Sequence, residues 1–260
     1  MKKAWVILLL LLLCVITHIA FRAYNYYAPP KLRQPYKTFR QDDTIRIAYI
    51  GDSWAYMHKN HNCKLAKMIS ESIHHPVSVH SFGICGLTSK EIYEALYDNS
   101  DFKQFMQAKG FHFCFVSAGI NDTYKKISTR YYKKSMEGII ELLLANNIHP
   151  IILEIPDYNI IKANDNQKTD KKLLRLLSMF INGTSLDCKQ DFRNALDELI
   201  NEKQYQDKIG VVRYKLWNNK YVHDQRKIYR KDGMHLNSYG YDILDSIITE
   251  QILHQPLFNN

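Results

Sequence analysis

The chain has 260 residues, of which 46% are hydrophobic, and a formal net charge of +9. This length suits one α/β domain with an N-terminal extension and leaves little room for two full domains. The hydrophobic content is enough for an ordinary core, which excludes a globally disordered chain. The basic residues are spread along the sequence without a nucleic-acid-binding motif, so we expect no nucleic acid partner.

The five cysteines follow no C-x-x-C spacing, which argues against a zinc site and against a redox motif. His58, His61 and Cys63 lie close together in sequence but lack a neighbouring carboxylate or a fourth ligand. We therefore predict no metal and no organic cofactor. Cys114, within an apolar stretch, is expected to be a buried strand residue.

The N-terminus indicates export or membrane attachment. Lys2 and Lys3 precede an apolar run that continues to Phe21, which is typical of an export signal and about long enough to span a bilayer. No clear cleavage site follows, so residues 1–22 are interpreted as a signal anchor, with a cleaved signal peptide as the alternative. We expect a membrane-anchored or exported protein of the cell envelope, although the basic residues from Arg22 onward favour the cytoplasmic side.

Residues 23–44 carry prolines and mixed polar residues without a sustained period, which is typical of a linker. The folded domain is predicted to cover residues 45–260. Within it, strands and helices alternate. Strands are expected at 45–50, 77–82, 111–117, 150–155 and 211–217, and helices at 63–73, 88–97, 130–146, 169–181, 186–202 and 238–253.

This alternation predicts a parallel five-stranded sheet with helices on both faces. In such sheets the sites form at the carboxyl ends of the strands. The most distinctive polar motifs of this sequence fall at those ends or just before a helix, which makes them candidates for a shared site.

Gly51, Asp52 and Ser53 end the first predicted strand. A nucleophilic serine needs an exposed hydroxyl on a tight turn, and a following helix N-terminus helps to stabilise negative charge. A tripeptide of this kind also arises by chance, with Ser53 as a simple helix cap, so it requires support from the rest of the sequence.

Asp232, Gly233, Met234 and His235 lie just before the last predicted helix. A carboxylate three residues before a histidine can accept its Nδ1–H bond, which leaves Nε2 free as a general base. The simpler interpretation is an exposed loop pair beside a helix cap.

Two further turns follow predicted strands. The segment 119–122 contains Asn121, whose amide can point at a developing oxyanion, where one such donor contributes about 3 kcal/mol. The segment 83–88 contains Gly86, a residue type that lets a backbone N–H approach a ligand closely. Each turn could equally be an ordinary strand-to-helix connection.

Together, these four motifs resemble the four blocks of the SGNH hydrolase superfamily, also called GDSL esterases and lipases, over residues 45–253. The resemblance implies a three-layer α/β/α, flavodoxin-like doubly wound fold. It also implies Ser53 as nucleophile, His235 as base and Asp232 as its orienting carboxylate. The oxyanion hole would consist of the backbone N–H groups of Ser53 and Gly86 and the side chain of Asn121.

The sequence departs from the family pattern at Trp54, where a small aliphatic residue is frequent, and at Ser81, where many members have asparagine. These departures leave the substrate pocket open. Trp54 and Tyr56 beside the serine, with Tyr124 after the central strand, are candidate substrate-binding residues that could stack on a sugar.

The resulting hypothesis is a serine esterase for short acyl esters, foremost acetyl esters, on a carbohydrate or envelope glycan. The alternatives are a lysophospholipase or lipase, an O-acyltransferase acting on a polysaccharide, and a non-catalytic polysaccharide-binding module. The expected partners are the ester substrate and, through the N-terminal segment, a membrane. The sequence leaves the oligomeric state open.

Overall fold

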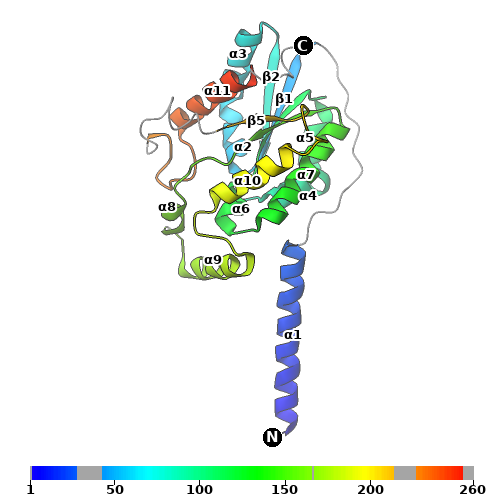
Figure 1. Cartoon of the computed structure of the whole chain (residues 1–260), viewed down its shortest axis with the longest axis vertical. Helices are drawn as coiled ribbons and strands as arrows, with labels where there is room; N and C mark the ends of the chain where they lie inside the picture. The colour runs from blue at the N-terminus through cyan, green and yellow to red at the C-terminus, as the bar shows by residue number, and fades with distance from the viewer. Residues whose placement is uncertain (1, 28–42, 166, 214–226, 254–260) are drawn as a thin grey trace.

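A computed structural model describes residues 2–27, 43–165, 167–213 and 227–253 of the chain (Figure 1). Five parallel strands form one sheet in the order β2-β1-β3-β4-β5. The strands are β1 (Ile45–Gly51), β2 (Val77–Gly83), β3 (Phe113–Ser117), β4 (His149–Leu153) and β5 (Gly210–Val212). The predicted five-stranded parallel sheet and three-layer α/β/α fold are confirmed.

Helices cover both faces of this sheet (Figure 1). The longer ones are α3 (Asn62–Ile73), α4 (Ser89–Asp98), α5 (Ser100–Ala108), α7 (Thr129–Ala145), α9 (Thr169–Asn182), α10 (Lys189–Ile200) and α11 (Ser238–Ile252). Three six-residue helices accompany them: α2 (Ser53–His58), α6 (Ile120–Lys125) and α8 (Ile160–Asp165). The prediction missed these three, because a helix of under two turns shows no apolar period. It also missed α5.

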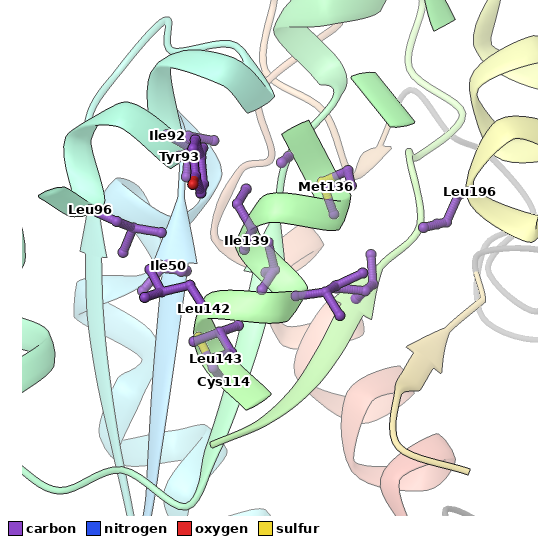
Figure 2. Close-up of a cluster of buried hydrophobic side chains, with 14 of the residues drawn as sticks. Ile50, Ile92, Tyr93, Leu96, Cys114, Met136, Ile139, Leu142, Leu143 and Leu196 are labelled. Carbon is purple, nitrogen blue, oxygen red and sulfur yellow. The ribbon is translucent and has the colours of Figure 1, made fainter. Parts of the chain in front are cut away.

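Alternation along β1 distributes its side chains between two cores. Ile47 and Tyr49 pack into the layer with α2, α3 and α11, while Ala48 and Ile50 face the layer with α4, α7 and α10. In that second layer Ile50 and the buried Cys114 lie against Ile139 and Leu143 of α7 (Figure 2). Each such buried aliphatic side chain contributes roughly 1.5–3 kcal/mol. The two cores fix the sheet on which the site is built.

Several element bounds differ from the prediction. The third strand begins at Phe113, and the last strand ends at Val212 among the described residues; positions 214–226, which include most of the predicted strand 211–217, lie outside them. A capping box begins α4: the Thr88 side chain accepts from the Glu91 amide, and the Glu91 side chain accepts from the Thr88 amide. This cap fixes the start of α4 next to the edge of the sheet.

The N-terminal segment forms a single helix, α1 (Lys2–Tyr27), which extends below the domain (Figure 1). Its portion Trp5–Tyr24 has a mean hydropathy of 2.5 and is the one described helix long and apolar enough to cross a bilayer. A signal sequence has the same length and composition. The helix continues beyond position 22, where the linker was expected to begin, and most of that linker, 28–42, lies outside the described residues.

Candidate active site

Ser53 is positioned by the sharp end of β1. Gly51 has a φ of 154°, and a Cβ at this position would lie 2.1 Å from the Ser117 carbonyl oxygen, so no other residue fits. Asp52 then caps α2, because its Oδ1 accepts from the Trp54 amide at 2.9 Å. Ser53 is the first residue of α2 and its side chain is nearly buried.

A turn before α11 brings Asp232 and His235 to Ser53. Asp232 Oδ1 accepts from the backbone amides of Met234 at 2.8 Å and His235 at 2.9 Å. Its Oδ2 lies 2.8 Å from His235 Nδ1, and His235 Nε2 lies 2.9 Å from Ser53 Oγ. Three predicted residues separated by up to 182 positions thus form one hydrogen-bonded chain. In this geometry the imidazole can take the hydroxyl proton while the carboxylate holds its tautomer.

Asp232 is kept ionised by its surroundings. Partial burial alone would raise the pKa of this carboxyl, but hydrogen bonds from the His235 and Met234 amides and from the His235 ring lower the pKa below its ordinary value. The side chain therefore carries its negative charge throughout the neutral and weakly acidic range, as an imidazole partner requires.

Trp54 aligns the two halves of this arrangement instead of facing substrate. Its side chain is fully buried, and its indole Nε1 donates to the Met234 carbonyl at 3.3 Å. The expectation that Trp54 binds substrate does not hold in this structure, because one step along α2 from Ser53 rotates the side chain into the core. Tyr56 is half-exposed with Lys59 over its ring, and it does not line the cavity beside Ser53.

Gly86 and Asn121 lie on the same cavity as Ser53. Gly86 has a φ of 82°, a conformation that favours glycine. Asn121 donates from Nδ2 to Asp52 Oδ2 at 3.0 Å and to the Leu87 carbonyl at 3.0 Å. Both amide hydrogens are thus engaged, and an oxyanion would have to share one of them. The Asp52–Asn121 contact was not predicted. The role of Asp52 as a helix cap could have been recognised, since an aspartate just before a helix is a common cap signal.

Two buried carboxylates lie beneath the site. Burial, supplemented by the charge of Asp122, raises the pKa of Asp52 to about 7, against hydrogen bonds from the Trp54 amide and Asn121. Burial also raises the pKa of Asp122 to about 6, although its oxygens accept from the Ser89 hydroxyl at 2.6 Å and amide at 2.8 Å. Both aspartates are fully buried, so the folded protein holds their protons more tightly than the unfolded chain.

This raised pKa gives Asp52 a measurable effect on stability. The unfolded chain releases the proton near pH 4 and the folded protein near pH 7, so ionisation increasingly favours unfolding across that window. Asp52→Asn keeps an acceptor for the Trp54 amide but cannot ionise. We expect the unfolding free energy of this variant to fall less between pH 4 and 7 than that of the wild type, by on the order of 2–4 kcal/mol. Denaturant titrations across this range provide the measurement; parallel wild-type and variant profiles would contradict it.

The cavity beside Ser53 has a volume of about 530 Å³. Tyr124, the third predicted substrate residue, lines it, and so do six further residues: Met57, Cys85, Ala163, Gln167, Lys171 and Met234. Ala163 comes from α8, Lys171 from α9, and Gln167 from the segment between these two helices. Positions 214–226, before the turn that carries Asp232 and His235, lie outside the described residues.

Among the described residues, no group of three His, Cys, Asp or Glu side chains could hold a metal ion. His58 instead makes a buried pair with Asp245, with Nε2 and Oδ1 2.7 Å apart, and its Nδ1 lies 3.1 Å from Asn62 Oδ1. This pair links α2, which carries Ser53, to α11, which follows His235. His58 therefore has a structural partner on each side of its ring.

The sequence profile of the GDSL-like lipase/acylhydrolase family matches residues 47–247 of the chain. The chain belongs to this family. The resemblance to the SGNH hydrolase superfamily is confirmed, and the GDSL-like enzyme described here is an ester hydrolase. No curated protein sequence matches it.

Solved structures show the same fold at low sequence identity. TesA matches with a TM-score of 0.57 and 14% identity, covering 82% of this chain and 99% of its own. The lipase Lip_vut3 from a goat rumen metagenome matches with a TM-score of 0.53 and 14% identity, covering 80% of this chain and 97% of its own. A GDSL-like lipase from Bacteroides thetaiotaomicron matches with a TM-score of 0.50 and 16% identity, covering 80% of this chain and 88% of its own.

Proposed function

We propose that this ester hydrolase uses Ser53 as nucleophile, His235 as general base and Asp232 as the carboxylate that orients the imidazole. The supporting observation is the continuous hydrogen-bonded chain from Ser53 Oγ through His235 to Asp232, with contacts of 2.9 and 2.8 Å. An arrangement of this kind activates a serine hydroxyl that is otherwise a weak nucleophile at neutral pH.

The reaction would proceed in two halves. Ser53 Oγ attacks the ester carbonyl carbon while its proton passes to His235 Nε2, and the resulting oxyanion is held by the backbone N–H groups of Ser53 and Gly86 and by Asn121 Nδ2. The intermediate collapses, and the alcohol leaves with the proton from His235. Water then attacks the acyl carbonyl carbon and gives its proton to His235. The bond between Ser53 Oγ and the acyl group breaks, the acid is released, and His235 returns the proton to Ser53 Oγ.

The proposed substrate is a short acyl ester, foremost an acetyl ester, on a carbohydrate or envelope glycan. Gln167 and Lys171 line the cavity together with Asn121, which gives it several hydrogen-bonding groups for sugar hydroxyls. Tyr124 on the same cavity offers an aromatic face. We further propose that α1 anchors the protein in the cell envelope, with the domain outside the cytoplasm.

The substrate proposal predicts a preference for short acyl groups. We expect kcat/KM for aryl esters to be highest with acetyl and to fall by at least about tenfold towards lauroyl, because added methylenes would leave Gln167 and Lys171 on the cavity without hydrogen-bonding partners. The measurement is a kinetic series from acetyl to lauroyl, followed by acetate release from acetylated glycans. Efficiency that rises with chain length would contradict the carbohydrate assignment.

A lysophospholipase or lipase is the second candidate, and one observation favours it. A groove of about 420 Å³ continues from the catalytic cavity through Tyr124, Gln167 and Lys171 to Leu174 on α9. The chain-length series separates the two candidates directly. An O-acyltransferase would use the same catalytic residues, and it would show transfer outcompeting hydrolysis when a sugar acceptor is added.

A further inference from the structure

Helix α9 presents its apolar side chains outward. Leu173, Leu176, Leu177, Phe180 and Ile181 are all exposed, and Phe180 has 88% of its surface accessible. A surface helix of a soluble domain ordinarily turns such residues towards the core. Contiguous exposed apolar residues on this scale indicate a surface that contacts another phase or another molecule.

The inward face of α9 is polar and is held by specific contacts. Arg175 is buried, with its guanidinium carbon 3.9 Å from the centre of the Tyr124 ring, and it donates to Asn164. Asn182 donates to the Lys126 carbonyl at 2.8 Å. These contacts, about two turns apart along α9, fix the rotation of the helix about its axis. The outward direction of the leucines is therefore built into the fold.

This apolar face adjoins the catalytic site. Lys171 of α9 lines the cavity that contains Ser53, and Leu174 and Arg175 line the groove that continues from it. A molecule or surface bound to α9 would therefore lie next to the cavity that contains Ser53.

The position of α9 relative to α1 identifies its partner. In Figure 1, α9 lies at the end of the domain from which α1 extends, to one side of the last turns of α1 and running crosswise to it. His18, Phe21 and Arg22 of α1 line a cavity together with Thr88 and Asp122, which places α1 at the catalytic end of the sheet. A bilayer spanned by α1 would therefore have its surface at the level of α9.

The charges around α9 fit a lipid surface. Three lysines and one aspartate occur among residues 168–172, at the start of the helix. Lysines that flank an apolar helical face are typical of helices that lie in the interface of anionic membranes, with the apolar side chains about 5–10 Å below the headgroups.

We propose that α9 lies in the interface of the bilayer that α1 spans, with its leucines and Phe180 among the acyl chains, so that the catalytic cavity opens at the lipid surface. This inference rests on the proposed membrane anchor and is independent of the proposed acyl preference. It implies that the enzyme acts on esters held at or close to the membrane.

Photocrosslinking of the full chain tests this placement. Phe180 is replaced with p-benzoylphenylalanine, the protein is reconstituted in vesicles of phosphatidylcholine and phosphatidylglycerol, and adducts are identified by mass spectrometry. We expect phospholipid adducts from position 180 and from a positive control at Trp5. We expect none from Lys67, an exposed residue of α3 at the far end of the domain. Adducts to a second copy of the chain, or none at position 180 while Trp5 reacts, would overturn the proposal.

Glutamate substitutions on α9 test the contribution of its apolar face. With the crosslinker at Leu173, the double variant Leu177→Glu with Phe180→Glu should reduce lipid adducts by at least about tenfold. Lys67→Glu changes the net charge by the same amount and should leave the yield unchanged. Hydrolysis of a soluble aryl acetate should persist in both variants, which separates failure of membrane docking from failure of the esterase. Equal adduct yields in the two variants would contradict the role of α9.

Discussion

Replacing Ser53 with alanine is expected to lower kcat/KM for an aryl acetate by at least about 10⁴-fold. The change removes the oxygen that lies 2.9 Å from His235 Nε2 and leaves the imidazole without a proton to accept. It leaves the backbone N–H groups of the proposed oxyanion hole in place. The cap from Asp52 to the Trp54 amide is also retained, so the variant should fold.

Cys85 provides a matched control, because it lines the same cavity and carries a thiol that could act as a nucleophile. Burial and the charge of Asp52 raise the pKa of its thiol, which disfavours the reactive thiolate. Cys85→Ala should retain activity and should still be labelled by a fluorophosphonate at Ser53. Loss of activity in Cys85→Ala together with full activity in Ser53→Ala would reverse the assignment.

The main elements of the fold could be predicted from the sequence because their patterns are long. The apolar run that becomes β3 matches what a strand buried on both faces requires, and α7 shows an apolar period over 17 residues. The short helix α2 has no such pattern, yet it decides which neighbours of Ser53 face substrate. For this reason the positions of Trp54 and Tyr56 could not be read from their closeness to the serine.

The site was predictable where its residues are neighbours in sequence or lie at strand ends. Asp232 and His235 share one turn, so their contact follows from local geometry. Asp52 and Asn121 come from different strand ends, and their 3.0 Å contact depends on how two turns meet across the sheet. Spacing along the chain does not contain that information.

The orientation of α9 was equally hidden. Its apolar residues recur at helical spacing, which ordinarily indicates an inward face. The polar contacts of Arg175 and Asn182 reverse this expectation, and both partners lie in other elements of the fold. The sequence just before α9 is polar, and the structure places the exposed apolar side of this helix beside it.

Asp232→Asn is expected to lower kcat for the aryl acetate by about 10³–10⁴-fold while preserving the fold. The asparagine oxygen can replace Oδ1 as acceptor for the Met234 and His235 amides, which keeps the turn intact. Its Nδ2 would then face His235 Nδ1 and donate to it. This places the remaining ring proton on Nε2, where it blocks transfer of the proton from Ser53.

Asp232→Ala separates orientation from charge. Alanine removes Oδ1, which accepts from the Met234 and His235 amides, so it should destabilise the turn more than asparagine does. It leaves the imidazole free to adopt the productive tautomer. We therefore expect alanine to be the less stable and the more active of the two variants. The measurements are kcat between pH 5 and 9, thermal unfolding, and nitrogen NMR of the imidazole to locate its proton. An asparagine variant with near-native kcat and a proton on Nδ1 would show that Asp232 does not set the tautomer of His235.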